Sequence, residues 1–328
     1  MRDVDYGWVI RYIHTTGASL FFAVVYLHMF RGLLYGSYQK PKELVWIFGC
    51  TIYLAMMAEG FLGYVLPYGQ MSYWGAQVII SLFGAIPYIG ESLELWVRGD
   101  YYISGITVSR FFALHVVALP LVLIALVFLH LVALHEVGAG NPEGVDIEKH
   151  LDDDGVPLDS VPFFPYKVLN ALVAIGVFMT VFSIIMFFFP EGGGYFIEMA
   201  NFQEANPLVT PDHIAPVWYY APFYTMLRAI PDPLGGLIVM AAAVAIFFVV
   251  PWLDRSKVAS IRYKGIYSKI AITLFGVSFL TLGYLGTVGV TEVRKLMSII
   301  CTVMYFAYFL LMPIYTKYET TKEVPERL

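Results

Sequence analysis

The chain is poor in charge and in cysteine, and both shortages exclude whole classes of protein. Only 14% of its 328 residues are charged, against roughly 25% in an ordinary soluble domain. The net charge of -5 offers no basic field that could hold nucleic acid. The two cysteines, Cys50 and Cys301, lie far apart inside apolar runs, and neither Cys-x-x-Cys nor Cys-x-x-Cys-His occurs. A disulfide framework, a thiolate metal site and covalently attached haem are therefore disfavoured.

Apolar residues dominate what is present. They make up 59% of the chain, and the mean hydropathy is +0.70, so they must face something as apolar as lipid. No stretch shows the alternating ten-residue pattern of a membrane barrel. The sequence therefore predicts an all-α fold, a polytopic transmembrane helical bundle, because each spanning helix needs about 20 mainly apolar residues. Its seven spans are expected near 8–35, 43–66, 107–135, 166–189, 233–251, 267–286 and 295–315.

The distribution of lysine and arginine predicts the orientation of the bundle. Of the 20 such residues, 13 fall on the side of the C-terminus and 7 on the other. By the positive-inside rule the C-terminus is expected to be cytoplasmic. Two long connections, 67–106 and 190–232, then lie on the outer side. Both carry apolar, aromatic and proline-rich runs, so we expect them to contain short helices and functional residues.

Four of the seven histidines lie inside two predicted spans. His14 and His28 are 14 residues apart in the first span, and His115 and His130 are 15 apart in the third. At about 100° per residue, each pair lies on roughly one helix face, separated by about 21 Å along the axis. Each helix thus presents one imidazole near the outer side of the membrane and one near the inner side.

The first and third spans run in the same direction, which puts His14 level with His115 and His28 level with His130. Two facing imidazoles at one depth, twice over, are the arrangement that two bis-histidine b-type haems need. A single intramembrane histidine is more often a structural residue, and a histidine proton relay in a cofactor-free transporter is an alternative. The matched depths favour haem ligation.

Arginines and glycines near these histidines fit the same interpretation. Arg11 and Arg110 lie near the outer ends of their spans and could pair with haem propionates, although snorkelling to the interface is an alternative. Gly49 and Gly63, also 14 residues apart, would let a flat macrocycle approach the second span. Close packing between helices explains such glycines equally well.

Taken together, these residues resemble the cytochrome b subunit of the quinol–cytochrome c oxidoreductases, the cytochrome bc complexes. The similarity runs nearly end to end. It is carried by the strings RYIHTTGAS at 11–19, GYVLPYGQMSYWGA at 63–76, AIPYIG at 85–90, RFFALH at 110–115, LHEVG at 134–138 and PVWY at 216–219.

The resemblance implies specific roles and partners. His14 and His115 would hold the low-potential haem b and His28 and His130 the high-potential one, both non-covalently. The subunit would oxidise quinol at an outer site and pass one electron across the membrane to a quinone at an inner site, coupled to proton translocation in a Q cycle. The implied partners are a Rieske iron–sulfur protein and a membrane-anchored c-type cytochrome, in a homodimeric complex.

Two features of the chain depart from the usual family pattern. The family normally has eight spans, and this chain begins at what looks like the second, so we expect either a truncation or a misplaced start. The spacing of 15 between His115 and His130 resembles chloroplast-type and some bacterial members. Because the chain continues through the last three family helices, it is interpreted as a bacterial long form in the cytoplasmic membrane. Residues 1–150 would form the di-haem domain, and 151–328 would complete the quinol-oxidation site.

The outer quinol site lacks its usual carboxylate. The family motif Pro-Glu-Trp-Tyr here has Val217 in place of glutamate, and valine cannot accept a proton. Glu59, one turn before Gly63 and Tyr64, is the only acidic residue deep in a predicted span. We therefore expect Glu59 to accept a quinol proton, so that Glu59→Gln slows quinol oxidation with haem content intact. The alternative is a protonated Glu59 that hydrogen-bonds a neighbouring helix.

The remaining site residues follow from the resemblance. Tyr64, Tyr219 and Tyr224 match tyrosines that border the quinol pocket, whereas His213 matches a position of mainly structural meaning. His135, at the cytoplasmic mouth, matches an inner quinone ligand. The aspartate usually found at the start of the following helix is not evident, and only Lys167 and Asn170 offer polar groups there. A di-haem membrane anchor of a quinone-linked dehydrogenase remains an alternative function.

Overall fold

The computed structural model describes residues 3–328, and over that range the chain is helical, with only two isolated β-bridges. Seven helices are long and apolar enough to cross a membrane, which confirms the predicted all-α transmembrane bundle. They are α1 (Gly7–Leu34), α2 (Glu43–Val65), the continuous span of α5 (Gly105–Ala113) and α6 (Leu119–Val137), α7 (Val168–Phe188), α9 (Pro233–Leu253), α10 (Ile266–Gly286) and α11 (Glu292–Leu310).

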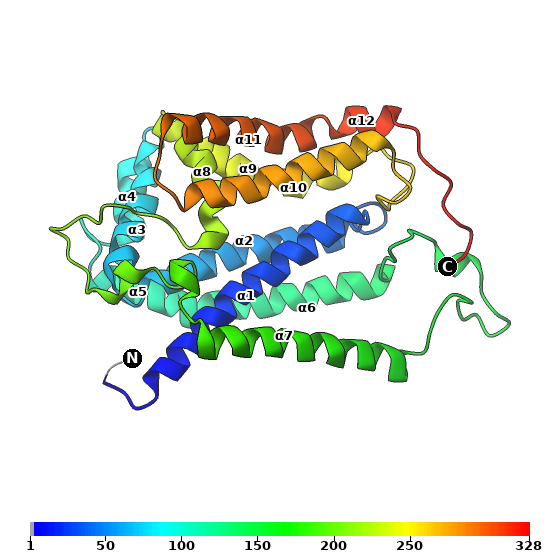
Figure 1. The fold of residues 1–328 in the computed structure, drawn as a ribbon, viewed down its shortest axis with the longest axis horizontal. Coiled ribbons are helices and arrows are strands. Elements are labelled where there is room, and N and C mark those ends of the chain that lie inside the picture. The colour runs from blue at the N-terminus through cyan, green and yellow to red at the C-terminus, as the bar shows by residue number, and fades with distance from the viewer. Residues whose placement is uncertain (1–2) are drawn as a thin grey trace.

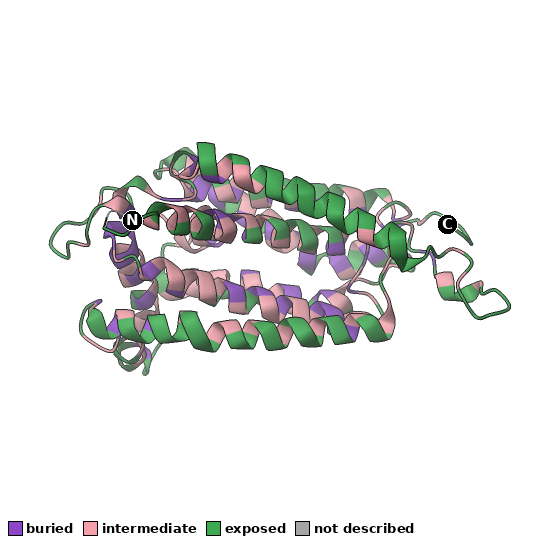
Figure 2. Ribbon diagram, turned by 90° about the horizontal axis from the view of Figure 1, so that it is seen from below, coloured by how far each residue is buried: buried purple, intermediate pink, exposed green. Residues whose placement is uncertain are grey.

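The long helices leave much apolar surface uncovered. Only 6% of the most apolar 18-residue window is buried in the span Gly105–Val137, and the same fraction in Phe163–Phe188. Figure 2 shows exposed residues along the outer sides of the long helices and buried ones between them. A fold that exposes the apolar side chains of two whole helices would be unstable in water. The chain is therefore a multi-pass membrane protein whose lipid-facing helices need no protein cover.

The two long connections contain the expected short helices and pack against each other. The first holds α3 (Gln70–Ser81) and α4 (Gly90–Arg98), and the second holds α8 (Ala221–Ala229). The backbone N–H of Gln70 donates to the Gln203 carbonyl at 3.0 Å. The Asn201 side-chain oxygen accepts from the backbone N–H and the hydroxyl of Ser72 at 2.9 and 3.1 Å. These contacts join the two connections at the end of the bundle where α1 begins, opposite the C-terminus (Figure 1).

The last predicted span, 295–315, is too long by several residues. Helix α11 ends at Leu310, and a separate short helix, α12 (Met312–Tyr318), follows it. Pro313 explains the break, because proline has no backbone N–H and its ring clashes with the preceding turn of a continuous helix. Hydropathy alone did not reveal the break, since the residues on both sides are apolar.

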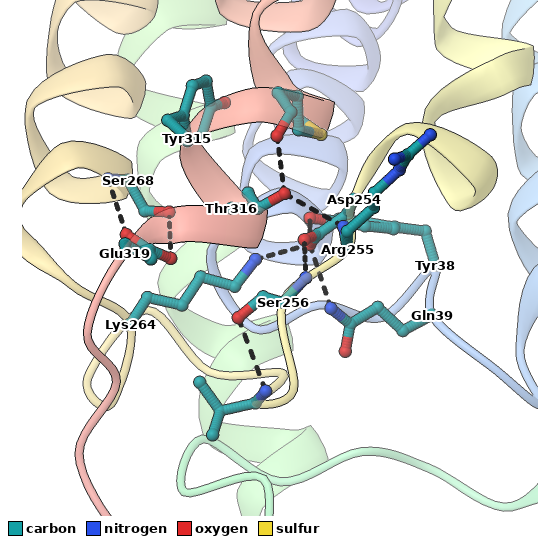
Figure 3. Close-up of polar contacts among 12 residues, drawn as sticks. Tyr38, Gln39, Asp254, Arg255, Ser256, Lys264, Ser268, Tyr315, Thr316 and Glu319 are labelled. Atoms are coloured by element: carbon teal, nitrogen blue, oxygen red, sulfur yellow. Dashed lines mark hydrogen bonds and ion pairs between the residues drawn. The ribbon is translucent and has the colours of Figure 1, made fainter.

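A buried polar network ties the bundle together at the end that carries the C-terminus (Figure 3). The Asp254 carboxylate accepts from Lys264 Nζ at 2.5 Å, Tyr38 Oη at 2.7 Å and Gln39 Nε2 at 2.9 Å. Burial pushes the pKa of Asp254 upward, but the Lys264 ammonium and these hydrogen bonds outweigh it, so the pKa lies below its ordinary value. The network thus joins the loop after α1 to the loop after α9.

Breaking this pair should destabilise the protein strongly. Asp254 and Lys264 side chains are 0% and 6% exposed, so Asp254→Leu leaves a buried ammonium without its partner, at a cost of about 3–5 kcal/mol. Thermal unfolding of the purified protein in detergent should show a lowered midpoint, which Asp254→Leu with Lys264→Met partly restores. Because the pKa of Asp254 is depressed, the contribution is present above pH ~4 and is lost as the pH falls through the folded-state pKa. An unchanged midpoint in the single variant would contradict this assignment.

Candidate haem and quinol sites

The structure brings the four intramembrane histidines together as two facing pairs. The ring centroids of His14 and His115 are 6.2 Å apart with an interplanar angle of 72°. Those of His28 and His130 are 6.4 Å apart at 71°. His14 and His28 belong to α1, whereas their partners belong to the span formed by α5 and α6. The two pairs thus repeat one geometry at two depths of the bundle.

A π-helical turn accounts for the spacing of 15 residues in the second helix. The turn covers Leu114–Ala118, between α5 and α6, and therefore contains His115. A π-turn accommodates one more residue than the α-helical register. Fifteen residues across it thus cover about the same rotation as 14 in α1, and His115 and His130 face their partners alike. In two regular α-helices, spacings of 14 and 15 residues would differ by about 100° of rotation. The π-turn removes this difference.

The two glycines of α2 lie directly against imidazole rings. A Cβ atom added to Gly49 would lie 3.4 Å from His130 Cε1, and one added to Gly63 would lie 2.9 Å from His115 Nδ1. The glycines therefore let the histidines of the neighbouring helix approach the backbone of α2. That the same glycines also admit a macrocycle stays a prediction.

The side chain of Glu59 lies against His115. His115 Nδ1 is 3.0 Å from the Glu59 backbone carbonyl and 3.0 Å from Glu59 Oε1. The other carboxylate oxygen, Oε2, is buried and has no hydrogen-bond partner in the described part of the chain. Both contacts of His115 place a hydrogen on Nδ1, which leaves the Nε2 lone pair free to bind a metal.

The donor set fits b-type haem at both pairs. A metal bound by both imidazoles of a pair lies about 2 Å from each ligating nitrogen, and each nitrogen lies half a ring from its ring centroid. Together these lengths give a centroid separation close to the observed 6.2 and 6.4 Å. Near His14, Arg11 Nε is buried without a hydrogen-bond partner among residues 3–328. An anion such as a propionate would satisfy this donor. Arg110 is exposed, and its guanidinium donates to the Trp96 carbonyl at 2.9 Å.

A pocket of about 260 Å³ lies between the C-terminal end of α2, the second long connection and Thr287, which follows α10. Tyr64, Tyr195, Glu198 and His213 supply its titratable groups, and Val217 forms part of its wall. Glu59 is absent from the described lining, because its carboxylate turns toward His115 instead. The pocket's own carboxylate is therefore Glu198, which sequence reasoning missed.

The other two predicted tyrosines, Tyr219 and Tyr224, are not among the lining residues of this pocket that the structure describes. The Tyr219 ring is 4% exposed and stacks on Phe22, with centroids 3.9 Å apart. Burial raises the pKa of Tyr219, so its hydroxyl stays protonated at neutral pH. Tyr224 Oη donates to the Ile214 carbonyl at 3.1 Å, and the Arg228 guanidinium lies 5.1 Å above its ring. These contacts hold the loop that forms the pocket wall.

The inner site is less defined. His135 lies in the last turn of α6 and is exposed, and it makes no hydrogen bond or ion pair with any residue that the structure describes. Lys167 and Asn170, at the start of the α7 span, are exposed as well. None of these three side chains lines the pocket beside Tyr64.

Comparisons with known proteins agree with this architecture. The family model "Cytochrome b/b6/petB" matches residues 1–138, and "Cytochrome b(C-terminal)/b6/petD" matches residues 204–306. A cytochrome b of Allochromatium vinosum is 56% identical over 336 residues, which cover 100% of this chain and 81% of that protein. A cytochrome b of Rickettsia bellii is 47% identical over 329 residues, covering 100% of this chain and 79% of the relative. A solved structure titled "Hyperthermophilic respiratory Complex III" superposes with a TM-score of 0.89 and 36% identity, over 97% of this chain and 81% of that one.

Proposed function

We propose, from the premise that this chain belongs to the cytochrome b family of bc complexes, that it is the di-haem subunit of a respiratory quinol–cytochrome c reductase. It oxidises quinol in its outer pocket, and one of the two electrons crosses the membrane to a quinone on the inner side in a Q cycle. The single observation that carries this proposal is the pair of facing histidine couples, 6.2 and 6.4 Å between centroids.

The residues of the bundle interior would hold the cofactors. His14 and His115 would bind one haem b, and His28 and His130 the other; when bound, these groups supply the one-electron carriers of the membrane span. Arg11 would pair with a propionate of the outer group, because its Nε atom is buried without a hydrogen-bond partner among residues 3–328. Gly49 and Gly63 keep the imidazoles of the second helix close to α2.

The outer pocket binds quinol and removes its protons. Glu198 accepts one proton as a carboxylate that lines the pocket, in place of the one that Val217 cannot supply. His213 and Tyr64, which line the same space, provide hydrogen-bond partners for the quinol oxygens. Tyr219 is not among the lining residues that the structure describes; its buried ring stacks on Phe22, so it takes no part in proton transfer.

On the inner side, His135 would hydrogen-bond the quinone from the end of α6. That end of the bundle also carries the C-terminus (Figure 1) and the lysine- and arginine-rich connections. By the positive-inside rule this end would face the cytoplasm, in a bacterial inner membrane as the family resemblance implies. A Rieske iron–sulfur protein and a membrane-anchored c-type cytochrome would take up the other quinol electron on the outer side, in a dimeric complex.

Enzyme assays on the purified complex test this function. We expect quinol-dependent reduction of cytochrome c, blocked by quinol analogues that occupy the outer pocket. A di-haem anchor of a dehydrogenase would keep its haem signals but show no inhibition by such analogues. Haem reduction by quinol that is insensitive to every outer-pocket analogue would thus contradict the proposal.

A further inference from the structure

Glu59 presents two acceptors to His115 Nδ1, the ring nitrogen that would not bind the haem iron. Its backbone carbonyl and its Oε1 atom are each 3.0 Å from Nδ1, so one N–H is shared between them. The Glu59 side chain is 21% exposed and that of His115 is 15%, which leaves little water to screen the contact. A carboxylate on the outer nitrogen of a metal-binding histidine raises the basicity of the ring.

The inner pair lacks this carboxylate. Glu59 lies four residues before Gly63, which contacts His115; the matching residue four before Gly49, which contacts His130, is Val45. The 14 residues between these positions are about four helical turns, so both lie on one face of α2. His130 Nδ1 is buried beside the backbone of Val45. Within residues 3–328, no group lies at hydrogen-bonding distance and angle from it.

We propose that Glu59 is a positioning residue that lowers the reduction potential of the outer haem relative to the inner one. This inference rests on the proposed function, because it requires His14 and His115 to bind haem. A more basic imidazole and a nearby negative charge both stabilise the oxidised, more positive iron over the reduced one. The presence of Glu59 at one pair and Val45 at the other thus contributes to the difference in reduction potential that favours electron transfer from the outer haem to the inner one.

Optical redox titration of the two b haems in the purified complex tests the proposal. Glu59→Gln keeps the shape of the side chain and removes its charge. We expect it to shift the redox equilibrium of the outer haem toward the reduced form roughly tenfold, about 59 mV for a one-electron couple. The outer component is identified as the one that His130→Leu retains. Glu43→Gln is the matched control, since it removes a charge from the same helix 16 residues away and should leave the outer potential unchanged.

The outcomes separate this inference from the proposed function. A wild-type complex without two b-type components would overturn the function itself. Two components at native potentials in Glu59→Gln would instead overturn only the role of Glu59. Glu59→Ala, which keeps the backbone acceptor and removes the carboxylate, replaces the glutamine variant if that variant does not assemble. An unchanged outer potential in Glu59→Ala overturns the proposal equally.

Discussion

Replacing His130 with leucine is expected to remove one of two b-type haem signals and leave the other in place. The inner pair would keep only His28, so that site would offer a haem one imidazole in place of two, whereas His14 and His115 at the other depth stay 6.2 Å apart. Leucine suits the apolar helix α6, so the fold should survive. Electron transfer from the outer to the inner side should fall by at least about 100-fold. Reduced-minus-oxidised spectra of membranes measure the loss of the haem signal, and time-resolved oxidation of the outer haem measures the fall in transfer rate.

His135→Leu is the matched control for this experiment. His135 lies five residues further along α6 and is exposed, so its loss should spare both haems and weaken only inner-site quinone reduction. If His130→Leu retains both signals, the pairing of His28 with His130 is wrong. Loss of both signals would show instead that the two sites do not form independently.

Glu198→Gln should slow quinol oxidation by about 100-fold or more while both haem potentials remain native. A positioned general base contributes about 10²–10⁴ to a proton-transfer step, and glutamine keeps the side-chain shape without the basicity. Glu204→Gln is the control, because Glu204 belongs to the same loop but is exposed and is not among the pocket-lining residues that the structure describes. Pre-steady-state reduction of the haems by quinol measures the step.

Glu59→Gln in the same assay tests the role first predicted for Glu59. Quinol oxidation slowed 100-fold with unchanged haem potentials would identify Glu59 as the proton acceptor and would contradict the assignment to Glu198. A near-native rate in Glu198→Gln would contradict that assignment by itself. We expect the opposite pattern, in which Glu198→Gln changes the rate of quinol oxidation and Glu59→Gln changes the potential of the outer haem.

Hydropathy and residue spacing were enough to predict the fold and the histidine pairs. The spans follow from runs of about 20 apolar residues, and the facing of His14 with His115 follows from span order and helical rise. Two local features were not predictable from spacing. The π-turn at Leu114–Ala118 has no composition signal that separates it from an α-helix, and the end of α11 depends on Pro313 inside an apolar run.

The roles of Glu59 and Glu198 could not be predicted from the sequence, because they depend on how the helices and loops pack. Glu59 is one turn from Tyr64, but which neighbouring helix its carboxylate meets depends on how α2 packs against the span that carries His115. Glu198 is one of several carboxylates in the connection 190–232, and only the folded loop shows that it lines the pocket beside Tyr64 and Val217. The absence of glutamate from the Pro-Val-Trp-Tyr string was the one available signal that another carboxylate was needed.

A potentiometric titration of b-type absorbance in the purified wild-type complex tests the central claim most directly. Two facing histidine pairs predict two components of equal amplitude, each a one-electron couple, with the lower potential belonging to the outer pair beside Glu59. A single component, or no b-type absorbance at all, would contradict the account, and complete absence would favour a cofactor-free transporter with a histidine relay.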